Sequence, residues 1–254
     1  MENAICNVAA APMRAEPAHR SEMSNQLLFG ETMQILEIKD EWLRVKSDYD
    51  EYEGWITNHL VKKYDPSPAI EPWRFVATGL VNPIIYQNQL INAPMGSFLT
   101  GYKEDTKTLW DETYQYHGSL KDIKQPVEMD QLWKIAQTWL NSPYMWGGKT
   151  FMGVDCSGFV QTVFKLMGKK IPRDAWQQAL AGEEVKSLEN SKAGDLVFFH
   201  NEKGRITHVA LLIQPNQVIH ASGKVRVDIL NETGIINSDH GRKTHDFNCI
   251  RRFF

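Results

Sequence analysis

Cysteine is scarce in the sequence, and the positions of the few cysteines exclude two common uses. Cys6, Cys156 and Cys249 form an odd set that contains no CxxC pair. Neither a disulfide framework nor a cysteine-rich zinc site is expected from such a set, and at least one thiol stays free.

Long apolar runs are also missing. No stretch approaches the roughly twenty apolar residues of a membrane-spanning helix. The first residues, MENAICNVAAAPM, contain no Lys or Arg and too short an apolar stretch for a secretory leader. We therefore expect no membrane segment and a cytoplasmic protein; a periplasmic or secreted protein from which a leader was removed would have the same sequence.

Basic residues are not in excess. The chain of 254 residues has 28 Lys and Arg against 31 Asp and Glu, and the two signs are mixed along it. A phosphate backbone requires a basic stripe, so nucleic acid is not an expected partner. With 42% hydrophobic residues the chain can bury a core and is long enough for more than one domain.

Two proline-containing or polar connectors divide the sequence. DPSPAIEP, residues 65–72, has three prolines in eight residues, which forbid regular pairing, and KDIKQP, residues 121–126, is a polar connector before a change of hydrophobic period. Before the first connector, the runs MQILEI, EWLRVK and GWITNHL alternate with charged turns, which predicts a small β-barrel in residues 1–65. The runs ATGLVNPIIY, GSFLTGY and TLWDETYQYHG predict a second barrel in residues 70–125.

The last part of the chain changes its hydrophobic period. Apolar residues fall at helical steps from Met129 to Leu140 and again from Phe159 to Met167. After residue 194, the runs DLVFFH, ITHVALLIQ, QVIHASG, VRVDIL and CIRRFF read as strands of an antiparallel sheet. Residues 127–254 are therefore predicted to form an α+β domain, with helices first and the sheet second.

Cys156 in GVDCSGFV stands at the predicted start of the second of these helices. The free N–H groups of a first helical turn stabilise a thiolate, so this position favours reactivity, although most cysteines on an apolar helix face are inert core residues. His208 and His220 lie in consecutive predicted strands joined by a QPNQ turn, so they are expected on one face, as base and orienting group. Zinc ligation by these residues is discounted because the spacings match no compact motif, and we expect no metal and no cofactor.

Five motifs in this order carry a resemblance to a known family. YMWGGKTFMGVDCSGFVQTVF, IPRDAWQQ, KAGDLVFF, ITHVALLI and VIHASGKVRVD resemble the NlpC-type family of papain-like cysteine peptidases. The run MRAEPAHRSEMSNQLLFGE, with WLRV and YEGWI after it, is similar to the first bacterial SH3 domain of dipeptidyl-peptidase VI-like enzymes. The resemblance implies a papain-like catalytic domain preceded by two bacterial SH3-like barrels.

The resemblance also implies an activity and roles for individual residues. The related enzymes are γ-D-glutamyl-L-diamino acid endopeptidases that cut murein peptides. It implies that Cys156 is the nucleophile, that His208 is the general base and then acid, and that His220 orients His208. The further residues that it implies for the oxyanion and for binding substrate are Tyr144, Asp155, Ser157 and Asp174; Asp174 has an equal alternative as the cap of a helix that begins near Ala175.

The first SH3-like domain is implied to hold the free ammonium of an N-terminal L-Ala. Glu16 and Tyr52 are the predicted contacts, and the competing carboxylates are those of Glu22, Glu31 and Glu53. Trp146 and Trp176 are candidates for the groove wall, although buried packing is the commoner place of tryptophan. A requirement for free L-Ala would reject intact cell wall and suit peptide recycling by a monomeric enzyme.

Two other functions stay open. The chain could be a murein-binding SH3 protein whose third domain is not catalytic, or an acyltransferase that passes the thioester to an amine other than water.

Overall fold

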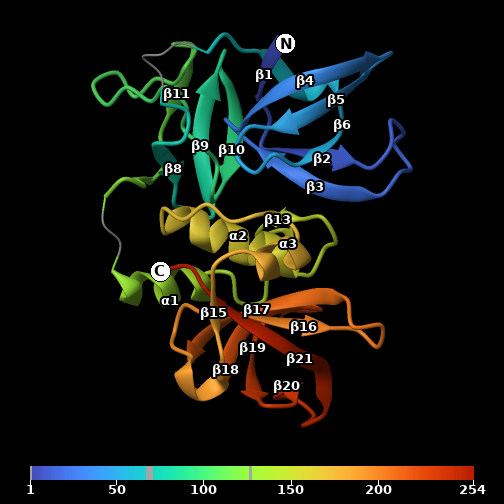
Figure 1. The fold of residues 1–254 in the computed structure, drawn as a ribbon. Coiled ribbons are helices and arrows are strands. Elements are labelled where there is room, and N and C mark those ends of the chain that lie inside the picture. Colours follow the sequence, from blue (N-terminus) through green and yellow to red (C-terminus); the bar gives the residue numbers. More distant parts are fainter. Residues whose placement is uncertain (1, 67–70, 126–127) are drawn as a thin grey trace. The chain divides into compact units, whose positions relative to one another are not determined.

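The computed structural model describes residues 2–66, 71–125 and 128–254. The chain forms two compact units (Figure 1): Met1–Pro126 with Trp146–Phe151, and Val127–Met145 with Met152–Phe254. Parts of both expected connectors, residues 67–70 and 126, lie outside the described residues. The domain boundaries expected from the sequence remain a prediction.

The first β module of the first unit is an antiparallel sheet of seven strands, in the order β3-β2-β6-β5-β4-β1-β7. The strands are β1 (Glu2–Cys6), β2 (Ala10–Arg14), β3 (Met23–Leu28), β4 (Thr32–Lys39), β5 (Trp42–Ser47), β6 (Glu53–Thr57) and β7 (Val61–Lys63), with a 3₁₀ turn, η1 (Asn58–Leu60), before β7. Alternate residues of these strands face a core that includes Met13, Leu27, Met33, Val45 and Ile56. The three predicted strand runs are thus confirmed, except that NHL forms the 3₁₀ turn.

The second β module is made of shorter strands. A three-stranded sheet has the order β10-β9-β11 and a two-stranded sheet joins β12 to β8. The strands are β8 (Phe75–Ala77), β9 (Val81–Tyr86), β10 (Gln89–Pro94), β11 (Tyr114–Tyr116) and β12 (Leu120–Asp122). The expected strand GSFLTGY is wrong: only Phe98 forms a bridge, to Val76. β10, which the sequence pattern missed, pairs with β9 across a tight turn in which Gln87 and Asn88 have positive φ.

A glycine joins the two β modules closely. Phe29, which follows β3, packs into the core of the second module with Leu99 and Tyr114. At the next residue, Gly30, a Cβ atom would lie 1.9 Å from the carbonyl oxygen of Phe98, and φ is +76°. Only glycine permits this approach of two backbones.

Residues 146–151 complete the first unit through a buried ion pair. Lys149 Nζ lies 3.3 Å from Glu31 Oε1, and both side chains are buried. The backbone N–H of Lys149 donates to Gln26 Oε1 at 2.7 Å, and Trp146 Nε1 donates to Glu22 Oε1 at 2.6 Å. This segment, which comes shortly before Cys156 in the chain, is therefore fixed to the first β module.

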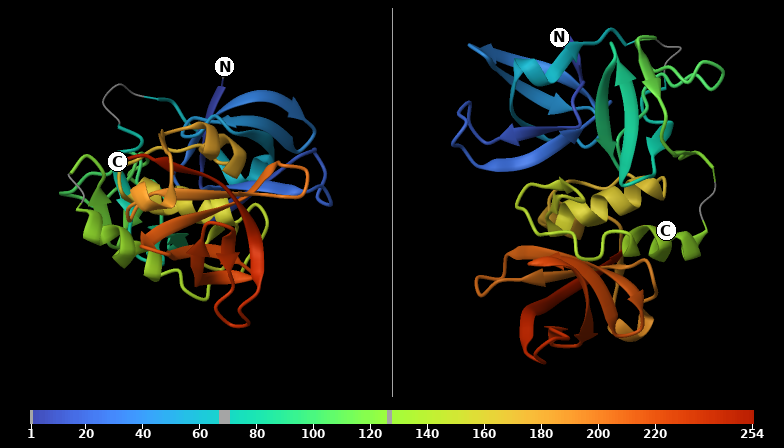
Figure 2. Two further views of the ribbon diagram at one scale, coloured as in Figure 1. Left: turned by 60° about the horizontal axis from the view of Figure 1, so that its bottom comes forward. Right: turned by 180° about the vertical axis from the view of Figure 1, so that it is seen from behind.

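The second unit contains an antiparallel sheet that closes on itself. Its order is β15-β21-β16-β17-β18-β19-β20, and β20 also pairs with β21. The strands are β15 (Glu183–Val185), β16 (Leu196–His200), β17 (Ile206–Gln214), β18 (Gln217–Ser222), β19 (Lys224–Asn231), β20 (Gly234–Ile236) and β21 (Lys243–Arg252), drawn in orange to red in Figure 2. The five predicted strands are confirmed, and β15 and β20 are additional.

Helices cover one side of this sheet. α1 (Met129–Gln137), α2 (Cys156–Leu166) and α3 (Ala175–Leu180) follow the predicted order, although α1 ends before Leu140. Every residue of α2 is buried, and the helix packs on β17 and β18. None of the helices in the described ranges is long and apolar enough to cross a membrane.

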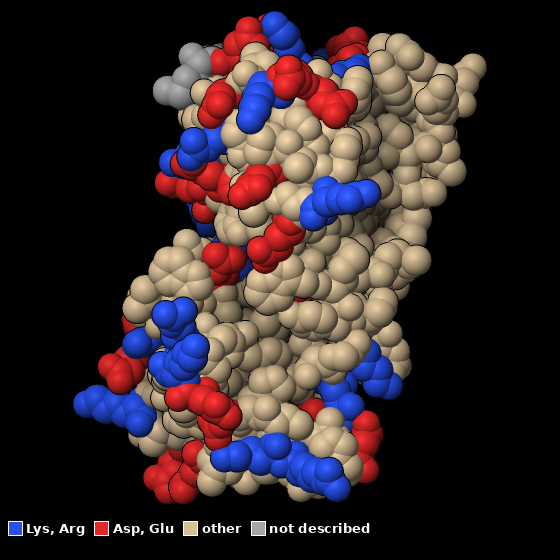
Figure 3. Space-filling model, turned by 90° about the vertical axis from the view of Figure 1, so that its right-hand side faces the viewer, with Lys and Arg blue, Asp and Glu red and all other residues tan. Residues whose placement is uncertain are grey.

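Charged side chains of both signs lie beside one another on the face in Figure 3. The described residues include surface ion pairs, such as Arg44 with Glu53 and Lys103 with Glu112. The expectation that nucleic acid is not a partner stays a prediction.

We predict that Lys149→Met lowers the free energy of unfolding by about 3 kcal/mol, because it leaves the Glu31 carboxylate buried without its cation. Urea unfolding measures the loss. Lys46→Met is the matched control, because the Lys46–Glu51 pair is at the surface and its removal should change stability by less than about 1 kcal/mol. Equal losses in the two variants would contradict the role given to burial.

Candidate active site

Cys156 is the first residue of α2, as the sequence predicted. Asp155 is the N-cap, and its Oδ1 accepts a hydrogen bond of 2.6 Å from the Gly158 N–H. The cap fixes the start of the helix, so the Cys156 thiol lies at the end of α2 where the dipole favours negative charge. Cys156 is 5% exposed to solvent.

A buried arginine holds this helix start in place. Arg173 Nη2 donates to Asp155 Oδ2 at 2.6 Å, and Nη1 donates to Asp155 Oδ1 at 3.0 Å and to Ser157 Oγ at 2.8 Å. The bidentate geometry makes both carboxylate oxygens of Asp155 acceptors of charge-assisted bonds. Asp155 and Ser157, the two neighbours of Cys156 in the sequence, are thus linked through one guanidinium group.

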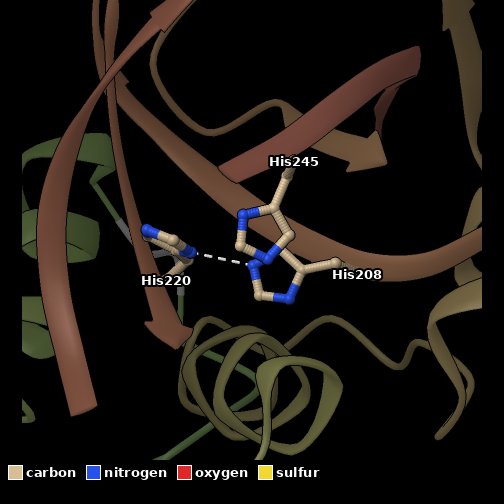
Figure 4. Close-up of side chains that lie close together, drawn as sticks. All are labelled: His208, His220 and His245. Carbon is tan, nitrogen blue, oxygen red and sulfur yellow. Dashed lines mark hydrogen bonds between the residues drawn. The ribbon is translucent and has the colours of Figure 1, made fainter. Parts of the chain in front are cut away.

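His208 and His220 lie together on adjacent strands of the sheet, β17 and β18 (Figure 4). The strands pair antiparallel with Leu211 opposite Ile219, as the short turn predicted. His208 Nε2 and His220 Nδ1 are 2.8 Å apart and share a hydrogen bond. The expected juxtaposition of the two imidazoles is therefore confirmed, while their catalytic roles remain a prediction.

The chain of hydrogen bonds continues beyond His220. His220 Nε2 lies 3.0 Å from Asp228 Oδ2 on β19, and both residues are buried. Burial alone would raise the pKa of Asp228, but hydrogen bonds from His220, the Ser238 backbone and Arg226 hold that pKa well below its usual value. Asp228 is consequently an ionised acceptor at the end of the chain.

The Cys156 thiol contacts the backbone of β17, the strand that carries His208. The N–H of Val209, the residue after His208, donates a hydrogen bond to the Cys156 sulfur. Burial and the Asp155 charge raise the pKa of Cys156 to about 12, and burial with His220 and His245 lowers the pKa of His208 far below 6.5. Both groups are therefore neutral at pH 7, and a proton must leave the sulfur as it attacks.

The pKa by itself does not single out Cys156. Burial also raises the pKa of Cys6 to about 12, but Cys6 lies in the apolar core of the first β module and donates to the Leu27 carbonyl. What distinguishes Cys156 is its place at a helix start beside the strand of His208.

A third histidine stacks on the pair. The rings of His245, on β21, and His208 are 4.1 Å apart at 26° (Figure 4), and burial with His220 lowers the pKa of His245 to about 4. One ring nitrogen from each of His208, His220 and His245 lies within 4.8 Å of the other two, so these histidines are candidate metal ligands. Stacked rings, however, direct their lone pairs along parallel planes and not to one point, and His208 Nε2 is already bonded to His220. The geometry disfavours a three-histidine site.

The other predicted residues of this domain have distinct surroundings. Tyr144 is half-buried, and burial, followed by the nearby Cys156 and Asp155, raises the pKa of its hydroxyl, which stays a donor at neutral pH. Asp174 caps α3 with Gln177, whose Oε1 accepts from the Asp174 N–H at 3.3 Å, so the capping alternative is confirmed. A substrate contact of Asp174 stays a prediction. Trp146 and Trp176 are both more than half exposed.

The candidate ammonium contacts lie in the first unit. Glu16 is exposed in the segment after β2, and Tyr52 packs against the core of the first β module. Of the competing carboxylates, Glu31 is buried against Lys149 and Glu53 pairs with Arg44. Glu22 accepts from the Trp146 indole, so it is fixed beside an exposed aromatic ring.

Sequence reasoning missed three residues of the site, namely Arg173, Asp228 and His245. For Asp228 the local pattern was misleading: alternation on β19 predicts a buried Ile229 and an exposed Asp228, but Asp228 is buried and Ile229 is 47% exposed. Arg173 directly precedes Asp174, and nothing in its local sequence distinguishes it from a surface arginine. His245 is on a strand without apolar alternation, and only the closing of the sheet brings it to His208.

Comparison with known proteins places these features in context. Residues 141–243 match the profile of the NlpC/P60 family, and residues 13–59 match that of the bacterial dipeptidyl-peptidase Sh3 domain. The chain is 30% identical to a protein named gamma-D-glutamyl-L-lysine dipeptidyl-peptidase from Bacillus subtilis (strain 168), over 83% of this chain and 77% of that one. It is 28% identical to dipeptidyl-peptidase 6 of Lysinibacillus sphaericus, over 91% of this chain and 92% of that one.

The fold has a close counterpart among solved structures. The crystal structure of an NlpC/P60 family protein from Bacillus cereus ATCC 10987 matches with a TM-score of 0.82 and 22% identity, over 99% of both chains. The two chains share their fold along their whole length.

We predict that the protein loses stability as the pH falls from about 6.5 to about 4. A histidine whose pKa is lowered from 6.5 to about 4 by folding binds fewer protons when folded than when unfolded, so acid in this interval favours unfolding. The loss from His245 should be on the order of 2 to 3 kcal/mol, and it levels off below pH 4. Urea unfolding at a series of pH values measures it.

His245→Gln should reduce this acid-dependent loss, while His240→Gln, at an exposed position, should leave it unchanged. The same pH dependence in all three proteins would show that the stacked ring is not its source.

Proposed function

Because this chain belongs to the NlpC/P60 family, we propose that it is a cysteine endopeptidase that hydrolyses the γ-D-glutamyl-L-diamino acid bond of murein peptides with a free N-terminal L-Ala. An SH3-like all-β region precedes its NlpC/P60 domain. The observation that carries the proposal is the position of Cys156 at the start of α2 beside the hydrogen-bonded His208–His220 pair. The name of the Bacillus subtilis relative, gamma-D-glutamyl-L-lysine dipeptidyl-peptidase, supports the proposed bond, and the name dipeptidyl-peptidase 6 supports peptidase activity.

In the first proposed step, the Cys156 sulfur attacks the carbonyl carbon of the γ-amide. The thiol proton passes to the ring nitrogen of His208 that is not bonded to His220, and His208 then gives this proton to the leaving amine. A thioester remains, and a water molecule activated by His208 hydrolyses it. Each turnover consumes one water molecule and restores the thiol.

The tetrahedral oxyanion needs donors that are already in place. The Cys156 N–H belongs to the first turn of α2, where no intrahelical acceptor exists for it. The Tyr144 hydroxyl is the proposed second donor, supported by its proximity to Cys156. One such donor contributes on the order of a hundredfold to the rate.

The remaining polar residues near Cys156 are assigned to holding the start of α2 or to binding the substrate. Since Arg173 already occupies both oxygens of Asp155, we assign Asp155 to holding the helix start rather than to direct contact with an anion. The Ser157 hydroxyl already donates to Asp155 Oδ1 at 3.3 Å and accepts from Arg173, so we assign the D-Glu α-carboxylate mainly to nearby backbone N–H groups and keep Ser157 as a proposed contact beside them. Asp174 is assigned to amine or peptide N–H groups of the substrate, because a carboxylate facing it would be repelled.

Specificity for free L-Ala is assigned to the first SH3-like region. Glu16 and Tyr52 remain the proposed contacts of the ammonium. Glu22 is the competing carboxylate that the structure favours most, because it is held beside the exposed Trp146 ring. We propose further that the protein acts as a monomer in the cytoplasm, on peptides released for recycling.

We predict that the wild-type protein releases the diamino acid from L-Ala-γ-D-Glu-L-Lys or from the meso-diaminopimelate analogue, and that Cys156→Ala abolishes the release. Product analysis by mass spectrometry measures it. Cys249→Ala is the control, because that thiol is half-buried on β21 and outside the site. Cleavage by neither the wild type nor the variant would favour a murein-binding protein, and acyl products with added amines would favour a transferase.

We predict that the carboxylate that meets the ammonium is revealed by comparing free and N-acetylated tripeptides. Substitution of that residue, in Glu16→Gln or Glu22→Gln, should raise KM for the free peptide by about tenfold and leave cleavage of the acetylated peptide unchanged, because only the free peptide carries the charge. Glu53→Gln serves as the control. An equal loss on both peptides would remove the substituted residue from the ammonium site.

A further inference from the structure

We propose that Asp228 is a positioning residue that, acting through His220, determines which ring nitrogen of His208 accepts the thiol proton. The inference rests on the proposed function and extends it to a residue that does not touch the substrate. It follows from the hydrogen-bond partners of a single buried carboxylate.

Asp228 is surrounded by donors on both oxygens. Oδ1 accepts from the Ser238 backbone N–H at 2.8 Å and from Arg226 Nη2 at 3.0 Å. Oδ2 lies 3.0 Å from its hydrogen-bond partner His220 Nε2, and the Arg226 guanidinium approaches it to 2.9 Å through Nε as an ion pair without a hydrogen bond. A carboxylate in this environment is ionised and can only accept hydrogen bonds.

The Asp228 carboxylate determines which nitrogen carries the hydrogen in both the His220 ring and the His208 ring. Because Asp228 accepts from His220 Nε2, a neutral His220 carries its hydrogen on Nε2 and has a lone pair on Nδ1. The 2.8 Å bond between His220 Nδ1 and His208 Nε2 then requires the hydrogen on His208 Nε2. A neutral His208 is left with its lone pair on Nδ1, and that nitrogen alone can accept the proton of Cys156.

Replacement of Asp228 by Asn would move the ring hydrogens of His220 and His208 from Nε2 to Nδ1. An Asn side chain has one oxygen and one NH₂ group, so one of the two positions now filled by oxygen must become a donor. Oδ1 accepts from the Ser238 N–H and from Arg226 Nη2, and neither donor can become an acceptor. At Oδ2, Arg226 Nε makes no hydrogen bond, and the His220 imidazole converts from donor to acceptor by moving its proton. The NH₂ group should therefore face His220, which shifts the hydrogens to His220 Nδ1 and then to His208 Nδ1. The proton acceptor for Cys156 is thereby blocked.

The expected decrease in kcat can be estimated from a known enzyme class. In the Ser-His-Asp triad of serine proteases, replacing the orienting Asp by Asn leaves the geometry intact but gives the wrong tautomer and reduces kcat by about 10⁴. Here the effect passes through a second ring, so Asp228→Asn should reduce kcat by a hundredfold or more, with little change in KM.

The first test is the tautomer itself, read by nitrogen NMR of the histidine-labelled wild-type protein near pH 7.5. His208 and His220 should both carry their hydrogen on Nε2. A hydrogen on Nδ1 of His208 would overturn the proposal, whatever the variants do. This measurement needs no substrate and does not depend on the folding of a variant.

The second test compares Asp228→Asn with Asp239→Asn. Both carboxylates pair with Arg226, Asp239 Oδ2 at 2.8 Å from its Nη1, but Asp239 does not reach His220 among the described contacts. Asp228→Asn should move both hydrogens to Nδ1 and lower kcat, and Asp239→Asn should change neither. Loss of activity in Asp228→Asn with both hydrogens still on Nε2 would show a merely structural role and overturn the proposal.

Failure of the proposed function gives a different result. If the wild-type protein cleaves no murein peptide, the peptidase assignment fails and Asp228 has no reaction to serve. If it cleaves the peptide while His208 carries its hydrogen on Nδ1, the peptidase assignment stands and the role of Asp228 fails.

Discussion

The hydrogen-bond chain from Asp228 through His220 to His208 is the constraint on which the site depends. It runs across three neighbouring strands, β19, β18 and β17, and is buried, so each polar atom in it must find its partner inside the protein. The antiparallel sheet supplies the spacing, because strands 4.7 to 4.9 Å apart bring side chains of one face within hydrogen-bond reach, as general sheet geometry requires. A mispaired strand would leave a buried donor or acceptor unsatisfied, which costs about 1 to 3 kcal/mol.

Two further buried charged pairs fix the segments that lead to the nucleophile. Arg173 holds Asp155, the cap of α2, and Lys149 with Glu31 holds the segment 146–151 to the first β module. Each pair satisfies charges that burial would otherwise penalise strongly, and each therefore tolerates only one local geometry. Each pair thus fixes a segment within its own compact unit.

Much of the fold could be read from local patterns. The alternation in residues 33–57 predicted the strands of the first β module, and the spacing from Phe159 to Met167 predicted α2. Prediction failed in less regular regions. GSFLTGY forms a buried loop, because the backbone of Phe98 lies against Gly30 and makes only an isolated bridge instead of a strand pairing. His208 and His220 were found together because the turn between their strands is short. His245 was not, since strand β21 lies far along the chain and reaches the site only by closing the sheet.

The sequence by itself determined the family, the order of the β modules and helices, and the cysteine and two histidines, since these depend on local periodicity and on motifs of adjacent residues. The tertiary structure decided which polar groups hold them. Arg173, Asp228 and Glu31 look like ordinary charged residues in the sequence, and only folding removes them from water and surrounds each with its buried partners. The reason is physical: a charge is common at a surface, but once buried it must be paired, and its partner is chosen by packing between strands and helices that no local pattern records.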